Sequence, residues 1–433
     1  MIDFAQIKKK ISELNIMEGD PVVWMILILL CIVSIVEVYS ASSRDSYGEE
    51  TFYGPVIKHG SLVCMSLVVA WVMHKIPCKF FKILTTFSLI FIAFPLMVYS
   101  LLFSATLNDT QRWVHMGGMS IQPSELVKIT LIGFVAFILS TLRTKSGRAN
   151  DSALKVVGIT TFIFCAMIGK ENLSTAGIIF MVIIGMLWLA DANRKVLFLG
   201  LSAITLTLAM SFMTIRSMSE DTVQSISNFS VGTTMVKRNG KMVEEPRRPL
   251  KRFATWAHRL QDKHERPADP KDYPIHDNEQ VTHAKIAIAN SNIVGRGPGK
   301  SIERDFIPQA NCDFIYSIIL EEGGIECGIA IVGLYLLLFF RSWKIAQQCA
   351  TRFPAYLVMG LSLMMVLQAM INMAVAVGAF PVTGQPLPLI SKGGSSGFIT
   401  CAYIGMILSV SRSAKKIKPE DEEDIITPIA ATV

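Results

Sequence analysis

The sequence predicts an all-α polytopic membrane protein with about ten transmembrane helices and a large extracytoplasmic loop between the seventh and the eighth. Composition is the first reason: of 433 residues, 51% are hydrophobic and only 17% are charged, whereas a soluble domain carries about a quarter charged residues. The mean hydropathy is +0.46. The second reason is that the long apolar runs do not alternate as barrel strands would, which indicates a helix bundle. The third is an uneven distribution of basic residues between the connections.

Ten apolar runs are long enough, or nearly long enough, to cross a bilayer core, which needs about 20 helical residues. They are Pro21–Ser40, Pro55–His74, Phe81–Leu102, Pro123–Leu142, Lys155–Gly169, Thr175–Ala190, Lys195–Met213, Phe314–Phe340, Ala355–Phe380 and Gly397–Val410. The fifth and sixth runs are marginal in length. The sequence leaves open whether these two form one broken helix or a re-entrant pair.

Lysine and arginine residues in the short connections predict the orientation in the membrane. One set of connections, together with both chain ends, contains nineteen basic residues, and the other set contains four. The sparse set consists of Arg44, Arg112, Lys170 and Lys392. Because basic connections stay in the cytoplasm, the tails 1–20 and 411–433 are predicted to be cytoplasmic and residues 214–312 to lie outside.

The outer segment 214–312 has internal organisation within a single integral-membrane domain that covers residues 1–433. Asn239-Gly240, between short arms that contain Val and Met, predicts a β-hairpin over residues 233–245. Residues 250–260 carry apolar side chains at helical spacing with basic residues between them. This pattern predicts a short helix that either lies in the headgroup layer or packs on the bundle.

The run Gly295-Arg-Gly-Pro-Gly-Lys-Ser301 resembles a phosphate-binding loop only superficially. The motif requires glycine where Val294 stands, and no strand precedes it, so nucleotide binding is rejected. A glycine-rich turn that lets the backbone approach a bulky headgroup stays open. The eight cysteines are scattered, mostly in apolar runs, and none of their spacings is typical of a zinc or redox site.

Asp313 closes the outer segment immediately before the apolar run that starts at Phe314. Aspartate is a favoured N-cap, so one interpretation is that Asp313 only caps the next helix. The alternative is that a carboxylate at the membrane surface acts on a lipid-linked substrate. Position alone favours the cap.

Residues 112–128 run from the outer side into the fourth span. They include Arg112, Gln122, Ser124, Glu125 and Lys128. Glu125 lies in the first helical turn, where the helix dipole favours an anion, and Lys128 lies three residues further on the same face. Either the two form a self-satisfied pair, or Lys128 is a bundle-facing cation for an anionic ligand.

The last outer connection, residues 381–396, is rich in Gly, Pro and Ser and includes Lys392, Ser395 and Ser396. This composition predicts non-helical backbone at membrane depth, which is tolerated only where it is buried in protein or lines a cavity. We expect an outward-facing cavity whose three cations and one carboxylate suit an anionic ligand and a general base, or a metal-held diphosphate. Its charged residues would be Arg112, Lys128, Lys392 and Asp313.

The motifs occur in a characteristic order. They are Arg112-Trp113, Gln122-Pro-Ser-Glu125 with Lys128, Pro308 followed by Asp313-Phe314-Ile315, Glu321-Glu322-Gly323, and the run from Pro381 to Ser396. Together they resemble the SEDS family of shape, elongation, division and sporulation proteins (FtsW, RodA and SpoVE), from the first span to about Ser411. Gly299-Lys-Ser301 and Pro308–Ala310 look closer to the division branch, FtsW, than to the elongation branch, RodA.

The resemblance implies an inverting peptidoglycan glycosyltransferase that polymerises lipid II at the division septum, in the bacterial cytoplasmic (inner) membrane. It implies that Asp313 matches the family's essential outer-loop aspartate, acting as a general base or holding a divalent cation, Mg or Mn. The implied substrate-binding residues are Arg112, Gln122, Ser124, Glu125, Lys128, Lys392, Ser395 and Ser396. The implied partners are a class B penicillin-binding transpeptidase and other division membrane proteins, and no nucleic acid is implied.

The chain departs from the family pattern at Lys170–Thr175, where an acidic position becomes Asn172 and Glu171 is a weak substitute. Lys392 stands where tyrosine is common. Two rival functions remain: a lipid II flippase or other transporter, and a non-catalytic scaffold of a division complex. A transporter should place its charges near the midplane of repeated halves, whereas this sequence shows no internal repeat and its charges cluster outside.

Overall fold

The computed structural model describes most of the helical part of the chain. The described residues are 17–41, 54–103, 114–116, 119–144, 148–193, 233–238, 241–246, 279–307, 312–380, 382–392 and 394–414, with single positions between 195 and 225. Several predictions fall outside them. These are Arg112, the helix expected over 250–260, and most of the seventh span, of the outer segment 214–312 and of both tails.

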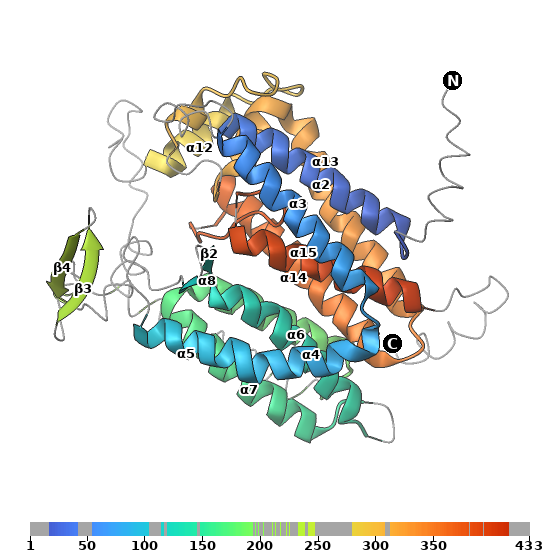
Figure 1. The fold of residues 1–433 in the computed structure, drawn as a ribbon. Helices are drawn as coiled ribbons and strands as arrows, with labels where there is room; N and C mark the ends of the chain where they lie inside the picture. The colour runs from blue at the N-terminus through green and yellow to red at the C-terminus, as the bar shows by residue number, and fades with distance from the viewer. Residues whose placement is uncertain are drawn as a thin grey trace, which may run out of the picture.

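The described chain is a bundle of helices (Figure 1). The long helices are α2 (Pro21–Ala41), α3 (Gly54–Lys75), α4 (Phe81–Ser88), α5 (Phe94–Phe103), α6 (Pro123–Thr141), α7 (Asp151–Glu171), α8 (Leu173–Leu189), α12 (Glu279–Ala289), α13 (Ile315–Gln347), α14 (Arg352–Ala376) and α15 (Gly394–Ser413). Short turns are η2 (Cys78–Phe80), the π-helical η3 (Leu89–Ala93) and η5 (Glu303–Asp305). Among the described residues, eight helical segments are long and apolar enough to cross a membrane, and α8 is a shorter apolar helix. The predicted polytopic helical class is confirmed.

Two small antiparallel strand pairs accompany the helices. Strands β1 (Val114–Met116) and β2 (Met119–Ile121) pair directly before α6. Strands β3 (Thr233–Arg238) and β4 (Lys241–Pro246) pair with Arg238 opposite Lys241. This register leaves a two-residue connection, as expected for a hairpin around Asn-Gly.

The fifth and sixth apolar runs form two separate helices joined at a single residue, Asn172. α7 has 21 residues and α8 has 17, and at their far ends the backbone N of Ala149 donates to the carbonyl of Ala190 at 3.2 Å. They are therefore an antiparallel hairpin and not one broken helix. The side chain of Asn172 accepts a hydrogen bond from the backbone N of Thr175, so it is the N-cap of α8.

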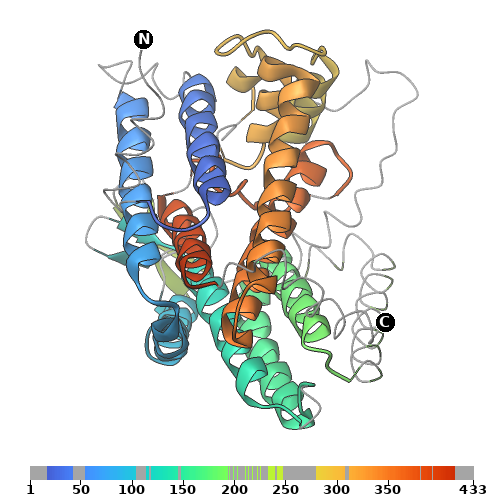
Figure 2. The same ribbon diagram turned by 90° about the vertical axis from the view of Figure 1, so that its right-hand side faces the viewer.

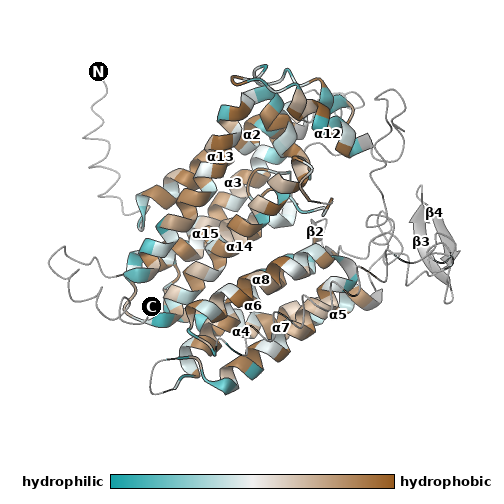
Figure 3. Ribbon diagram, turned by 180° about the vertical axis from the view of Figure 1, so that it is seen from behind, coloured by the Kyte–Doolittle hydropathy of each residue, from teal (hydrophilic) through white to brown (hydrophobic). Residues whose placement is uncertain are grey.

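The helices nearest the two chain ends pack together. α15 packs closely on α3, and α13 contacts both α2 and α14; Figure 2 shows the orange helix α13 beside the blue helix α2. α6 contacts both α4 and α14 and so connects the part of the bundle around α4 to the part around α14. Apolar residues dominate the middle of the helices and hydrophilic ones gather toward their ends (Figure 3). This banding is what a bundle surrounded by lipid requires.

α13 is interrupted near its start, at Gly324. There φ is 75° and ψ is −179°, a region that only glycine adopts readily. The preceding segment lies against this break, with the backbone N of Arg296 donating to the carbonyl of Glu321 at 3.0 Å. A Cβ atom on Gly295 would lie 2.3 Å from the backbone N of Gly324. The close approach of two backbones explains why both positions are glycine.

Glu321 and Glu322, the two acids within this apolar helix, hold the glycine-rich segment. They are 0% and 1% exposed. The carboxylate of Glu322 accepts hydrogen bonds from the backbone N of Gly299 at 2.8 Å and of Ser301 at 3.1 Å. That of Glu321 accepts from Ser301 Oγ at 2.5 Å and lies 3.7 Å from Arg296 Nη1. These amides are thus bound to protein carboxylates and are not available to a headgroup.

Candidate active site

The irregular segment 382–392 lies at the centre of the candidate site. It is largely buried, as non-helical backbone at membrane depth must be. Side chains from the surrounding helices satisfy its carbonyl groups. The donors are Asn372 Nδ2 to Gln385 O (2.7 Å), Gln368 Nε2 to Pro386 O (3.0 Å), Tyr335 Oη to Pro388 O (2.5 Å) and Ser34 Oγ to Ile390 O (2.9 Å). Helices α2, α13 and α14 therefore fix the segment in place.

Asp313 lies against this segment. Its backbone carbonyl accepts a hydrogen bond from Asn372 Nδ2 at 2.9 Å, and the carbonyl of Cys312 accepts one from Ser391 Oγ at 2.5 Å. Helix α13 begins at Ile315 with Phe314 as its N-cap. The interpretation of Asp313 as the N-cap is therefore wrong. Asp313 is half-buried, on a backbone that is held from two directions.

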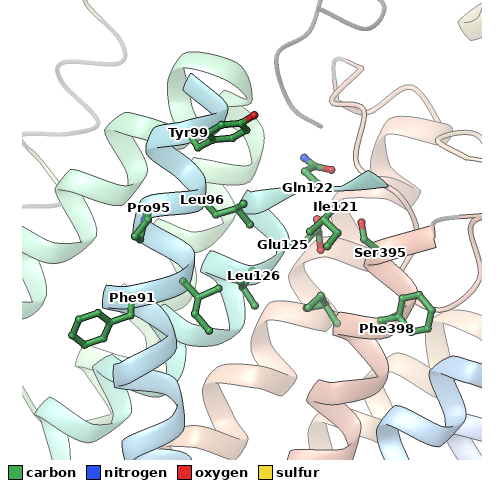
Figure 4. A pocket seen from close by; sticks show the side chains of 12 residues that line it. Phe91, Pro95, Leu96, Tyr99, Ile121, Gln122, Glu125, Leu126, Ser395 and Phe398 are labelled. Carbon is green, nitrogen blue, oxygen red and sulfur yellow. The ribbon is translucent and has the colours of Figure 1, made fainter. Parts of the chain in front are cut away.

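A groove of about 620 Å³ opens between the α4–η3–α5 segment on one side and α6 and α15 on the other (Figure 4). Its walls are mostly apolar and include Phe91, Pro95, Leu96, Leu126 and Phe398. Its polar groups come mainly from Tyr99, Gln122, Glu125 and Ser395. In Figure 4, Gln122, Glu125 and Ser395 lie together, opposite the apolar side chains of η3 and α5. Such a groove suits a ligand with a long apolar part and a polar end.

Glu125 and Lys128 form an ion pair at the edge of this groove. Lys128 Nζ lies 2.7 Å from Glu125 Oε1, and both side chains are buried. The pairing of the two residues, one of the alternatives left open by their spacing, is confirmed. Lys128 Nζ also donates to Gln368 Oε1 at 3.0 Å. Since Gln368 binds the carbonyl of Pro386, a bonded chain connects the groove to the irregular segment.

The predicted site residues fall into three groups. Gln122, Glu125 and Ser395 line the groove, with Lys128 directly behind Glu125. Asp313 and Lys392 flank the contact in which Cys312 Sγ approaches the carbonyl of Lys392 at 3.5 Å. Ser124 is buried and Ser396 half-buried, and neither lines the groove. The expected single cavity therefore separates into a groove and an adjoining Asp313 region.

Several buried polar atoms in this region make no hydrogen bond to the described part of the protein. They are Ser124 Oγ, Ser395 Oγ, Asn372 Oδ1, Thr383 Oγ1 and Gln385 Oε1. Buried polar groups normally find partners, so their concentration around the segment indicates places where a ligand or water could bind. Gln385 is held at the same time by the bond from its Nε2 to Thr175 Oγ1, at 2.7 Å.

Some of these residues could not be identified from motifs. Gln368 and the apolar wall formed by Phe91, Pro95 and Leu96 carried no recognisable pattern, because they are ordinary residues of apolar helices. The one local feature is the π-helical turn η3, which precedes Pro95 and shifts the faces of the helix. The role of Asn372 in holding Asp313 depends on tertiary packing, so no local pattern could predict it.

Curated relatives match nearly the full length of the chain. The chain is 25% identical over 397 residues to the probable peptidoglycan glycosyltransferase FtsW of Coxiella burnetii, covering 90% of this chain and 95% of that protein. It is 27% identical over 384 residues to the corresponding protein of Nitrosococcus halophilus, covering 87% of each. The peptidoglycan glycosyltransferase MrdB of Escherichia coli is 24% identical over 405 residues, covering 92% of this chain and 95% of that protein.

Solved structures share the fold. One, described as "Structural coordination of polymerization and crosslinking by a peptidoglycan synthase complex", matches with a TM-score of 0.67 and 20% identity, covering 91% of this chain and 98% of that chain. The rod shape determining protein RodA of Thermus thermophilus matches with a TM-score of 0.60 and 19% identity, over 92% and 98% of the two chains. The model of the family described as "Cell cycle protein" matches residues 20–234 and 250–416. The chain therefore belongs to the FtsW/RodA/SpoVE family of cell cycle proteins.

Proposed function

We propose that this protein is a peptidoglycan glycosyltransferase that polymerises lipid II, an undecaprenyl-diphosphate-linked disaccharide pentapeptide, during septal cell-wall synthesis. The names of the similar full-length proteins support this reaction. The observation that carries it is structural: a half-buried aspartate, Asp313, is fixed beside a segment that a bonded chain connects to an apolar groove.

The groove suits the lipid part of such a substrate. An isoprenoid chain would lie against the apolar side chains from η3, α5 and α15, while its polar end would meet Gln122 and Ser395. Lys128 does not face this end as a bare cation, because Glu125 lies 2.7 Å from its ammonium group. We therefore assign the Glu125–Lys128 pair to holding the edge of the groove. Neutralisation of the diphosphate would fall to Lys392 and Arg112, the latter outside the described residues.

Asp313 is the proposed general base. The hydroxyl of the acceptor sugar would attack the anomeric carbon of the donor while its proton passes to the Asp313 carboxylate. A new carbon–oxygen bond forms, the bond from that carbon to the diphosphate oxygen breaks, and the lipid diphosphate leaves with the bonding electrons. A single displacement of this kind converts an α-linked donor into a β-linked product. No covalent sugar–enzyme intermediate is needed.

A divalent cation would be held here together with the phosphates of the substrate. The described residues contain no group of three or more His, Cys, Asp or Glu side chains that could hold a metal. Magnesium is commonly held by one or two carboxylates together with substrate phosphates. Asp313 would supply one such carboxylate, and a bound Mg or Mn would offset negative charge on the leaving diphosphate.

The orientation of the protein bears on which side of the membrane the reaction takes place. Nineteen basic residues on one face of the membrane against four on the other favour cytoplasmic termini and an outward-facing Asp313. This orientation supports a reaction at the outer surface of the bacterial cytoplasmic membrane, and the proposed location within that membrane is the septum. A class B penicillin-binding transpeptidase and other division proteins would be its partners. The similar solved complex, whose description joins polymerization to crosslinking, supports the transpeptidase.

Polymerisation of fluorescent lipid II by the purified protein with its transpeptidase tests the proposal. We expect the wild-type protein to produce glycan ladders on a gel. Asp313→Asn should lower the rate by about 10²- to 10⁴-fold, the usual contribution of a general base. Asp305→Asn, which changes a partly exposed acid in the same outer region, is the matched control and should polymerise normally. Ladders from Asp313→Asn at the wild-type rate would exclude the proposed role, and a scaffold or flippase would then explain the fold better.

A further inference from the structure

A second cavity lies at the opposite ends of the helices that frame the groove. It has a volume of about 370 Å³ and is formed by the start of α4, the end of α6 with the residues after it, and the start of α14. Three of its lining residues are basic: Lys82, Arg143 and Arg352. Its lining includes no acidic residue among those that the structure describes. We call it the basic pocket.

Aromatic side chains position two of the three cations. Arg143 donates from Nη2 to Tyr356 Oη and from Nε to the carbonyl of Leu139, the latter at 2.9 Å. Its guanidinium lies 5.2 Å from the centre of the Tyr356 ring, and Lys82 Nζ lies 5.3 Å from that of Phe353. Cation–π contacts of this kind orient the charged groups. The walls of the pocket thus carry fixed positive charge.

Three cations from three helices around one cavity should strongly favour an anion. A guanidinium in particular matches the geometry of phosphate oxygens.

The pocket also adjoins a surface that lipid would cover. Next to Lys82, the side chains of Phe80, Ile83 and Phe87 are 49%, 70% and 53% exposed, although all three are large and apolar. In a bilayer this face of α4 contacts acyl chains. A phosphate group in the pocket can therefore belong to a lipid whose acyl chains lie along α4. A free phosphate ion would not need such an apolar surface.

We propose that the basic pocket binds the phosphate of an anionic phospholipid in the cytoplasmic leaflet. Under the orientation given above, the pocket lies at the cytoplasmic membrane surface, where basic pockets between helices take anionic headgroups. The bound lipid joins α4, α6 and α14. α4 continues directly into η3 and α5, which with α6 form walls of the groove at the other side of the membrane. Binding should therefore stabilise the frame of the groove.

Binding of phosphatidylglycerol by the full-length protein tests this proposal. In neutral detergent, native mass spectrometry counts bound lipids and thermal unfolding reports stabilisation. We expect phosphatidylglycerol to bind and to raise the unfolding temperature, whereas phosphatidylcholine should do neither. Inorganic phosphate forms a separate arm of the experiment. If it protects as well as phosphatidylglycerol does, the ligand is a free anion and the lipid proposal is overturned.

The variant Lys82→Gln/Arg352→Gln should weaken phosphatidylglycerol binding at least tenfold, since it removes two of the three cations of the pocket. The matched control is Arg148→Gln/Lys344→Gln, which removes two exposed charges from the same side of the bundle outside the pocket and should bind normally. Arg352→Gln alone provides a milder variant, because Arg352 is exposed. Equal binding by the pocket variants and the control would overturn the proposal.

Discussion

The buried lysine Lys128 illustrates what a single side chain contributes at the candidate site. It is 1% exposed and is held by Glu125 at 2.7 Å and by Gln368 at 3.0 Å. Desolvation of two ions is costly, so such a pair is tolerated when its hydrogen bonds are complete. Here the hydrogen bond to Gln368 adds a second partner for the ammonium group. Lys128 is therefore first a structural residue, and its effect on catalysis should follow from the groove that it supports.

Replacing Lys128 by methionine should destabilise the protein by about 3–5 kcal/mol, because Glu125 would remain as a buried carboxylate without its partner. The double variant Glu125→Gln/Lys128→Met removes both charges and should recover much of this loss. Thermal unfolding in detergent measures the difference. Lys300→Met, at an exposed lysine, is the control. A Lys128→Met protein as stable as the wild type would show that the pair contributes little.

Asp313 and Glu125 show how far the sequence predicts individual site residues. Both could be selected as site residues because charged residues at the edge of an apolar run are unusual. The motifs that contain them supported the same choice. A chemical role for Asp313 could be predicted from the sequence, but the contacts that hold Asp313 in place could not. These contacts are hydrogen bonds between side chains and backbone, from Asn372 and Ser391, which are distant in sequence from Asp313.

Among the elements, the break in α13 shows a strict requirement for glycine. A Cβ atom at Gly324 would lie 2.2 Å from the carbonyl oxygen of Ile293 and 2.5 Å from the backbone N of Gly295. Gly299 also has a positive φ, of 78°, but nothing lies within 4 Å of the place where its Cβ would be. The two glycines thus separate backbone strain from steric overlap.

Gly324→Ala should cost on the order of 3 kcal/mol or more, since it combines unfavourable backbone geometry with overlap against a second backbone. Gly299→Ala should cost only about 1–2 kcal/mol, because strain acts alone. The yield of monodisperse protein and its unfolding temperature measure both effects. Equal behaviour of the two alanine variants would mean that the contact between segment 292–297 and α13 is not rigid.

Most helices could be located from their apolar runs, because a bilayer demands length and hydrophobicity of every span. The α7–α8 pair was ambiguous because α8 is short and only one residue separates the two helices. The glycine-rich segment could be recognised as something other than a nucleotide loop. Its attachment to Glu321 and Glu322 could not be predicted, since the four residues in contact come from two separate stretches.

At the scale of the whole molecule, the groove results from how helices distant in sequence are arranged in space. η3 and α5 come from the first quarter of the chain and α15 from its end. They face each other across the groove, which has a volume of about 620 Å³. Hydrophobicity alone does not distinguish a side chain that faces this groove from one that faces lipid. For this reason the sequence predicted a cavity from its polar residues and missed its apolar walls.

The orientation of the bundle gives a prediction for the whole molecule. A cysteine at Lys300 should react with a membrane-impermeant maleimide in intact cells with permeable outer layers, because this residue lies on the proposed outer side. A cysteine at Gln347 should react only after the cytoplasmic membrane is opened. Both positions are exposed. The wild-type chain, with its eight native cysteines, sets the background. The reverse pattern would place Asp313 in the cytosol and remove the proposed reaction.

The most direct measurement combines binding and turnover in one sample. Lipid II with a photoreactive group in its isoprenoid chain is irradiated with the wild-type protein or with Asp313→Asn, and the attached peptides are identified by mass spectrometry. We predict that both proteins are labelled in the groove, at peptides that contain Phe91, Leu96, Leu126 or Phe398, and that only the wild type forms glycan chains. Labelling outside the groove, or glycan chains from Asp313→Asn at the wild-type rate, would contradict the proposed function.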